Sequence, residues 1–312
     1  MVEILTAGEI LVEIMREKVG TGLDETDRFV GPFASGAPAI FIDAVANLGH
    51  VAAMIGGVGN DDFGDVCLKR LRGDGVNTSG IKVSKLPTGA AFVAYFEDGS
   101  RKFIFHVSDS AASDTGELPA KVIKRVKIFH VMGCSLMINK ELAEKIIKYA
   151  KLVKDSGGKV SFDPNIRVEL MNKDFIKNAV NHIIKLSDIV LPGIKELFLL
   201  TGNNDKDGAI NKLLEKVNVL VLKQGAKGCE IHSKNLEKPV TVLPFKVREV
   251  DPTGAGDAFD AGFLCAHLEG QSLYECGVLA NACGALNTTR LGPMEGIFKR
   301  ETVEEFIKKN KA

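Results

Sequence analysis

The stretch DPTGAGDAFDAGF, residues 251–263, places Gly254, Ala255 and Gly256 directly before the carboxylate of Asp257, and an apolar helical pattern follows at once. Glycines permit backbone conformations that turn several N–H groups to one side of a turn. If a helix begins near Ala255, its first N–H groups have no partner within the helix, and its dipole favours an anion. The stretch therefore predicts a small anion-binding cradle, although an ordinary glycine turn before an acidic helix start would give the same letters.

Strand and helix patterns alternate along the rest of the chain. Strands are predicted at 2–8, 51–59, 126–133, 159–164, 188–192 and 217–225, and helices at 37–48, 63–73, 140–155, 173–186, 194–201, 255–269, 273–289 and 301–310. Such alternation predicts an α/β fold with a mostly parallel sheet sandwiched by helices. Ligands of such sheets bind beyond the carboxyl ends of the strands, which is where the stretch 251–263 is expected to lie.

Two β-rich segments, about 10–33 and 88–108, do not fit this alternation, and the second carries a turn signal at Asp98-Gly99-Ser100. We predict that they form a small β-sheet lid inserted in a single α/β domain, 1–312, and that the lid covers the pocket. The same lid offers strands that a second subunit could pair with, so a homodimer through the lid is expected. A further β-rich stretch is predicted at 228–250.

Composition excludes several classes of function. Lysine plus arginine and aspartate plus glutamate both total 40, so no global basic excess suggests nucleic acid or an acidic membrane as a partner. The six cysteines and six histidines show no zinc-like spacing, and the cysteines are interpreted as reduced and buried. The N-terminus lacks the basic start of a signal peptide, and no apolar segment is long enough to span a bilayer. A cytoplasmic location is expected.

The cradle and its carboxylate suit the transfer of a phosphoryl group to an alcohol. The cradle would stabilise charge on the moving phosphate while Asp257 takes the proton of the hydroxyl. No G-x-x-x-x-G-K-[ST] motif occurs, so the site is not a P-loop. Because Asp257 falls in the first turn of a helix, we expect its pKa to be lowered.

These residues resemble a known family. DPTGAGDAFDAGF resembles the C-terminal signature of the PfkB (ribokinase-like) carbohydrate kinases, and residues 35–64 resemble the N-terminal signature. The blocks DPNIR at 163–167, LPGIKE at 191–196 and KQGAKG at 223–228 resemble those that lie between, most closely in the ketohexose and ketogluconate kinase branch. The resemblance covers essentially the whole chain and implies a ribokinase-like fold, ATP and Mg²⁺ as cofactors, and a small sugar as the phosphate acceptor.

The resemblance also implies roles for individual residues. Asp257 would be the catalytic base, and the amides of Gly254, Ala255 and Gly256 would form the anion hole. Nucleotide contacts would come from Lys223, Gly225, Gly228 and Asn281, with Gly254 and Gly256. Sugar contacts would come from Glu13, Gly36, Arg101 and Arg167, with Asp257. Glu196 would help to hold Mg²⁺ through water, and Asp251 and Thr253 would lie at a monovalent-cation site for K⁺. From the residues alone, Glu13 also fits an exposed strand carboxylate and Arg101 a solvated turn residue.

Three positions depart from the family pattern. Ile40 and Gly193 stand where relatives carry asparagine, and Val107 stands where acid-sugar kinases often carry arginine. Without that arginine, a neutral ketohexose such as tagatose or fructose is the expected substrate. A 2-keto-3-deoxygluconate kinase using Arg101 and Arg167 is the alternative within the family. A non-catalytic sugar- or nucleotide-sensing relative is the alternative outside it, supported by Ile40 and Gly193.

Overall fold

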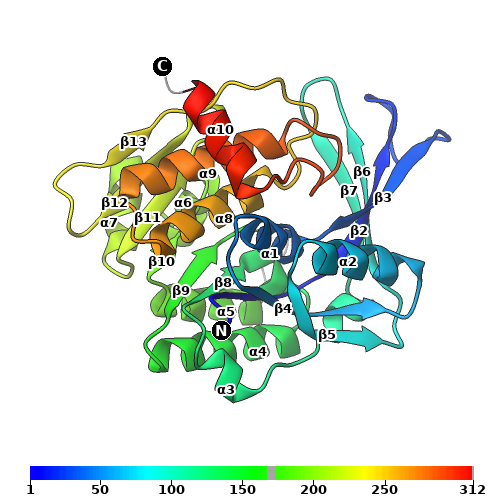
Figure 1. Ribbon diagram of the computed structural model, residues 1–312, viewed down its shortest axis with the longest axis horizontal. Coiled ribbons are helices and arrows are strands. Elements are labelled where there is room, and N and C mark those ends of the chain that lie inside the picture. Colours follow the sequence, from blue (N-terminus) through cyan, green and yellow to red (C-terminus); the bar gives the residue numbers. More distant parts are fainter. Residues whose placement is uncertain (167–172, 311–312) are drawn as a thin grey trace.

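The computed structural model describes residues 1–166 and 173–310, and in this part of the chain the strands form two separate sheets (Figure 1). The large sheet has the strand order β13-β12-β11-β10-β9-β8-β1-β4-β5. Its strands are β1 (Ile4–Ala7), β4 (Ala52–Gly59), β5 (Asn77–Ser84), β8 (Ile128–Met132), β9 (Lys159–Asp163), β10 (Ile189–Val190), β11 (Val219–Lys223), β12 (Cys229–Ser233) and β13 (Val240–Val242).

From β5 to β11 every neighbouring pair in the large sheet is parallel, and only β12 and β13 run antiparallel. The central strands are buried along nearly their whole length, as expected where helices cover both faces of a sheet. The predicted fold class, a mostly parallel sheet sandwiched by helices with a smaller sheet beside it, is confirmed.

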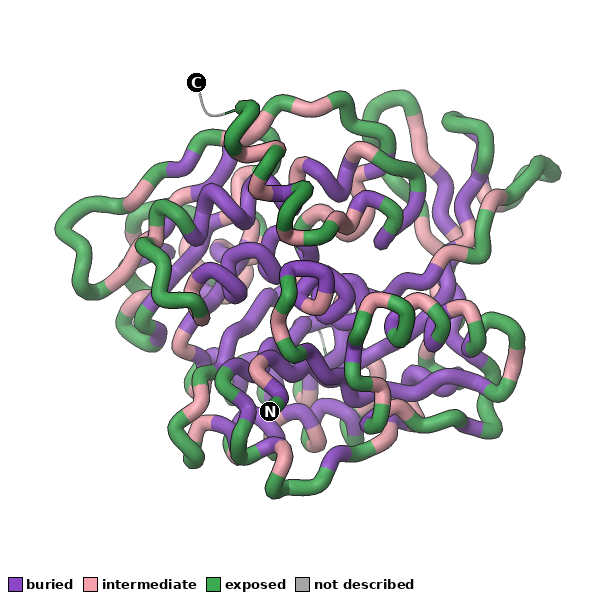
Figure 2. Tube along the Cα trace, in the orientation of Figure 1, coloured by how far each residue is buried: buried purple, intermediate pink, exposed green. Residues whose placement is uncertain are grey.

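Two apolar clusters form the core, one on each face of the large sheet. Helices α1, α8 and α9 contribute Phe41, Phe263 and Leu279 to one cluster, and α4, α5 and α7 contribute Ile146, Ile183 and Ile210 to the other. Figure 2 shows the buried interior running through the centre between these layers. The helices are α1 (Ala37–Asn47), α2 (Asp62–Gly73), α3 (Ala120–Ile123), α4 (Lys140–Asp155), α5 (Asp174–Leu186), α6 (Ile194–Thr201), α7 (Lys206–Leu214), α8 (Ala255–Leu268), α9 (Leu273–Asn287) and α10 (Arg300–Asn310).

The small sheet, called the lid from here on, has the order β3-β2-β6-β7 and stands beside the large sheet (Figure 1). Its strands are β2 (Leu11–Arg16), β3 (Phe29–Ser35), β6 (Gly89–Tyr95) and β7 (Arg101–His106). They come from the two predicted segments, with β3 extending to Ser35. Only residues 8–10 separate β1 from β2, and only Gly36 separates β3 from α1, so the lid joins the large sheet and its helices through very short links.

Neither β5 nor α7 was predicted from the sequence. β5 lies at the edge of the sheet and most of its side chains are exposed or half-buried, so its sequence NTSGIKVS lacks the apolar run of a buried strand. The β-rich prediction for 228–250 was too broad, because only β12 and β13 form there. None of the helices in the described part of the chain combines the length and apolarity that a membrane span needs.

Candidate active site

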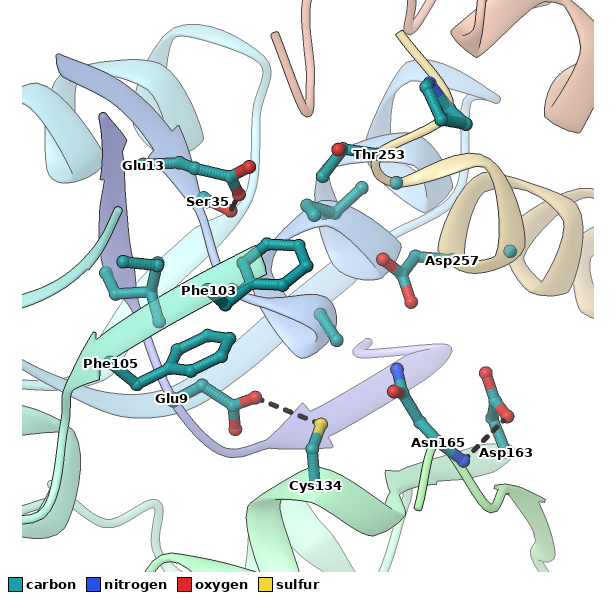
Figure 3. Close-up of a pocket in the computed structure, with 18 of the residues that line it drawn as sticks. Glu9, Glu13, Ser35, Phe103, Phe105, Cys134, Asp163, Asn165, Thr253 and Asp257 are labelled. Carbon is teal, nitrogen blue, oxygen red and sulfur yellow. Dashed lines mark hydrogen bonds between the residues drawn. The ribbon is translucent and has the colours of Figure 1, made fainter. Parts of the chain in front are cut away.

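A cleft of about 690 Å³ lies between the lid and the start of α8. Glu13, Phe103 and Phe105 of the lid line one wall, and Asp257 lies across the cavity from them (Figure 3). The fold brings most of the predicted site residues to this one cleft. Those lining it are Glu13, Gly36, Arg101, Glu196, Lys223, Thr253, Gly254, Gly256 and Asp257.

The start of α8 forms the predicted cradle. Gly254 is the N-cap residue with φ 79° and ψ −5°, a conformation that favours glycine, and a Cβ atom there would lie 2.4 Å from the carbonyl oxygen of Pro293. The N–H of Ala255 donates to Pro252 over a long 3.4 Å. Among the described residues, no acceptor is found for the N–H groups of Gly256 and Asp257. These two groups are therefore available to an anion at the positive end of the helix dipole.

The Asp257 side chain is buried at the floor of the cleft, with the residue 8% exposed. Burial, and next the charge of Asp163, raise the pKa of Asp257 well above its usual value, although Lys223 acts in the opposite direction. The expectation of a lowered pKa was wrong, because it considered only the helix dipole. A raised pKa makes the ionised carboxylate a stronger base for a hydroxyl proton.

Lys223 lies at the end of β11, and its ammonium is held by two carboxylates. Lys223 Nζ is 2.8 Å from Asp163 Oδ2 and 3.2 Å from Asp260 Oδ1. Burial alone would lower the pKa of Lys223, but the neighbouring Asp163 and Asp260 raise it. Neither aspartate was singled out from the sequence. The predicted nucleotide contact of Lys223 must therefore compete with two short ion pairs.

Glu13 is buried and faces the cleft from β2. The Ser35 hydroxyl donates to Glu13 Oε2 at 3.0 Å, while Glu13 Oε1 is buried and has no partner among the described residues. Burial raises the pKa of Glu13 to about 7. The interpretation of Glu13 as an exposed strand carboxylate was wrong. Arg101, by contrast, is exposed, with its guanidinium 5.8 Å from the centre of the Phe103 ring.

Glu9 lines the same end of the cleft and was missed in the sequence. The Cys134 thiol donates to Glu9 Oε1 at 3.0 Å (Figure 3). The Ser135 hydroxyl donates to Glu9 Oε2 at 2.6 Å. The acidic residue in GEIL, directly after a strand that ends in glycine, was the available signal. Glu9 and Glu13 place two buried carboxylates at the lid end of the cleft.

The Asp251 carboxylate, predicted for a monovalent-cation site, accepts hydrogen bonds at both oxygens. Its Oδ1 accepts from the Tyr95 hydroxyl at 2.8 Å and from the Thr253 N–H at 2.9 Å, and its Oδ2 accepts from the Gly292 N–H at 2.9 Å. Tyr95 belongs to β6, so this cluster joins the lid to the loop before α8. In the part of the chain that the structure describes, no group of three or more His, Cys, Asp or Glu side chains is arranged to hold a metal ion.

Glu196 lines the cleft and also closes the start of α6. Its Oε2 accepts from the Gly193 N–H at 2.7 Å, and its Oε1 accepts from the Ile166 N–H at 3.1 Å. Gly193 is the N-cap residue, so the absence of asparagine there leaves the helix start intact. With both oxygens already accepting one bond, Glu196 suits a contact to magnesium through water, which each oxygen's second lone pair permits.

The remaining predicted residues lie outside the lining of the cleft or outside the described part of the chain. Gly225 and Gly228 have positive φ in the turn between β11 and β12, and a Cβ atom on Gly228 would lie 2.1 Å from the Val242 carbonyl oxygen. Asn281 Nδ2 donates to that carbonyl at 3.2 Å and to the Leu243 carbonyl at 3.0 Å. The cleft lining, as described, includes none of these three, so their nucleotide contacts stay predictions. Arg167 lies outside the described residues.

Comparison with known proteins adds the family. Residues 4–299 match the model of the pfkB family carbohydrate kinases. The probable fructokinase-4 of Arabidopsis thaliana is 31% identical, with 98% of this chain and 97% of that protein covered. A crystal structure of a putative ribokinase II from E. coli in complex with ATP and Mg²⁺ is 39% identical, with a TM-score of 0.91 and 99% and 100% of the two chains covered. A fructokinase double mutant from Vibrio cholerae O395, in a form with fructose, ADP and potassium bound, is 26% identical, with a TM-score of 0.83 and 98% of each chain covered.

These matches agree with the chemistry of the cleft, in which an anion cradle and the Asp257 carboxyl group lie across the cavity from hydrogen-bond acceptors of the lid end. They favour an enzyme over the non-catalytic sensor considered from the sequence. The chain belongs to the PfkB family of carbohydrate kinases and is a phosphotransferase that acts on an alcohol group.

Proposed function

We propose that the protein transfers the γ-phosphate of ATP to a primary hydroxyl of a neutral ketohexose, fructose or tagatose. ATP and Mg²⁺ are the cofactors named for the similar E. coli structure, and fructokinases are among the relatives. These relatives favour fructose of the two sugars. Tagatose differs only in the configuration at one carbon, so both sugars belong in the test.

The observation that carries the proposal is the unpaired Oε1 atom of Glu13. A buried carboxylate oxygen without a partner is costly, and a sugar hydroxyl that donates to it would remove that cost. Among the described residues of the cleft, five carboxylates (Glu9, Glu13, Asp163, Glu196 and Asp257) face two cations, and one cation, Lys223, is already paired. These acidic groups would repel the carboxylate of an acid sugar, whereas a neutral sugar carries no charge for them to repel.

In this mechanism the sugar hydroxyl lies beside Asp257 and attacks the γ-phosphorus in line. Asp257 accepts the hydroxyl proton, and the free N–H groups at the start of α8 stabilise the negative charge on the transferred group. When bound, magnesium would neutralise charge on the phosphates, and Glu196 would hold it through water. The lid residues Phe103 and Phe105 cover the opposite wall with apolar rings, which limits access of water to the phosphate.

The test is ADP release from the purified protein with Mg-ATP and fructose, tagatose, ribose, 2-keto-3-deoxygluconate or adenosine, with Asp257→Asn as the control. Turnover on one ketohexose that is lost in the variant supports the proposal and names the substrate. Turnover on 2-keto-3-deoxygluconate alone overturns the neutral-sugar assignment. That outcome would point to Arg101, which makes no ion pair among the described residues, as the carboxylate contact.

We also propose a homodimer formed through the lid and a stimulation by K⁺. Phe29 of β3 and Ile104 of β7 are 41% and 43% exposed on the two outer strands of the lid, which suits contact with a second lid. Light scattering after size exclusion tests the dimer, and Ile104→Lys should weaken it. Replacing KCl by NaCl at equal ionic strength in the kinase assay tests the cation.

A further inference from the structure

Lys223 joins three elements of the active site through a single side chain. It ends β11, and its Nζ contacts Asp163 at the end of β9 and both carboxylate oxygens of Asp260 on α8, at 2.8 Å, 3.2 Å and 3.3 Å. Asp163 and Asp260 are 3% and 0% exposed. The three side chains are therefore enclosed at the floor of the cleft, where their electrostatic interactions are little screened by water.

The two carboxylates that hold Lys223 lie next to the reacting groups. Asp260 follows Asp257 by three residues on α8, so the two side chains occupy neighbouring positions on one face of the helix. Asp163 Oδ1 accepts the N–H of Asn165 at 3.2 Å, and Asn165 lines the cleft (Figure 3). Lys223 thus connects the turn of α8 that carries Asp257 to the loop on the other side of the cleft.

Several elements around the floor of the cleft place titratable side chains near Asp257. Acidic groups are Asp163 on β9, Glu196 on α6, Glu9 before β2 and Glu13 on β2, in addition to Asp260 on the helix itself. Burial raises the pKa of Asp260, Glu196 and Glu13. His130 on β8 is neutral at neutral pH, because burial lowers its pKa to about 3, and its Nδ1 contacts the Ser161 hydroxyl. Near Gly254, α1 and α9 contribute Ile40 and Asn287, which carry no charge.

Lys223 is the cation within this buried set, and Arg101 lies exposed at the rim. A methyl group on Gly256 would lie 3.7 Å from Lys223 Nζ, which places the ammonium directly beside the cradle. A buried carboxylate without a compensating charge takes up a proton, and a protonated Asp257 cannot accept one from the sugar.

We propose that Lys223 is a positioning residue for phosphoryl transfer: its ammonium, clamped between Asp163 and Asp260, fixes the first turns of α8 and supplies a positive charge that favours the ionised form of Asp257. This inference rests on the proposed function, in which Asp257 is the base. It replaces the interpretation of Lys223 as a nucleotide contact, because two buried carboxyl groups already hold the ammonium in place.

The experiment compares two variants that change the charge near Asp257 in opposite senses. Lys223→Met removes the positive charge, and Asp163→Asn removes a negative charge while keeping an oxygen that accepts the Asn165 N–H. In the pH profile of kcat/KM for the sugar, the midpoint of the acidic limb should shift by about 1 pH unit in each variant. The shift should be to higher pH in Lys223→Met and to lower pH in Asp163→Asn. In Lys223→Met, kcat should fall roughly 100-fold while the KM for ATP changes less than about threefold.

Two further variants keep the test interpretable. Lys206→Met is the matched control, because Lys206 pairs with Glu230 at 2.7 Å away from the cleft, and its profile should equal that of the wild type. If Lys223→Met does not fold, the double variant Lys223→Met/Asp260→Asn removes the ammonium together with one of its carboxylates. It should fold and still show the shift to higher pH, because burial raises the pKa of Asp260 and its replacement therefore removes little negative charge near Asp257.

The outcomes separate the inference from the function on which it rests. A KM for ATP raised tenfold or more with kcat unchanged would restore Lys223 as a nucleotide contact and overturn the inference. Profiles that do not move, or that move in the same direction in both charge variants, would also overturn it. Full activity of Asp257→Asn would instead remove the base from the proposed function.

Discussion

The two walls of the cleft differ in how their side chains are held. On the α8 wall, hydrogen bonds within the protein fix the side chains: Asp251 accepts three, and Asn287 Nδ2 donates to the Thr253 and Pro293 carbonyls at 2.8 Å and 3.2 Å, although Asn287 Oδ1 is buried without a partner among the described residues. On the lid wall, Glu13 Oε1 has no partner among the described residues and Arg101 is exposed. The side chains around the proposed base are therefore held in place by the protein itself, whereas the lid wall, which we propose faces the sugar, leaves an acceptor for a ligand to complete.

The largest effect expected from this comparison is on the α8 wall. Asp257→Asn keeps the shape of the side chain but removes the base, so kcat should fall roughly 10²- to 10⁴-fold with a smaller effect on ATP binding. Steady-state assays with saturating sugar, together with ATP titration by calorimetry, check both parts. Turnover close to that of the wild type would show that Asp257 on the α8 wall is not the catalytic base.

Gly254→Ala should damage the cradle without removing any polar group. The new Cβ would force a left-handed residue against the Pro293 carbonyl, so we expect a loss of about 1–3 kcal/mol in the free energy of unfolding and a roughly tenfold lower kcat. Denaturant unfolding and kinase assays measure the two effects. Gly256→Ala is the control for stability, because a Cβ there would meet only Lys223 Nζ at 3.7 Å, and its unfolding should be unchanged.

Glu13→Gln tests the lid wall, and its effects on binding and stability should be opposite in sign. The KM for the sugar should rise roughly tenfold, since a hydrogen bond to a charged acceptor is lost, while kcat changes less. Because burial raises the pKa of Glu13 from 4.5 to about 7, its native state holds a proton that the unfolded state has released between these values, and its contribution to stability falls as pH rises through this window.

The variant should consequently gain stability at pH 8, by up to about 3 kcal/mol, and little at pH 4.5. Thermal unfolding at the two pH values measures this difference. A loss of stability at pH 8 would mean that the Ser35 hydrogen bond outweighs the cost of burying the charge.

Tyr95→Phe should have the smallest effect, because it breaks only the contact between the walls. The Tyr95 hydroxyl lies 2.8 Å from Asp251 Oδ1 and 2.7 Å from Thr253 Oγ1. Losing it should cost about 1 kcal/mol of stability and raise the KM for the sugar a few-fold at most. A loss of kcat as large as that of Gly254→Ala would instead show that this contact sets the geometry of α8.

The sequence predicted what depends on neighbours along the chain. The cradle at 254–257 and the helix after it are local features, and the structure contains both. Glu9, Asp163 and Asp260 were missed because their roles depend on partners 37 to 126 positions away. The direction of the Asp257 pKa shift was wrong for the same reason: the dipole is visible in the sequence, but burial and the charge of Asp163 appear only in the fold.

The short links of the lid have a consequence for engineering. Glu9 lies on the link from β1 to β2, and Gly36 is the link from β3 to α1, so both connections carry residues of the cleft. We expect that a lid taken from another member of the family, inserted as residues 9–36 and 88–108, would change the proposed sugar contacts while the sequence of α8 stays the same. Such a chimera would have to keep a tyrosine at position 95, because the Tyr95 contacts to Asp251 and Thr253 join the lid to the loop before α8.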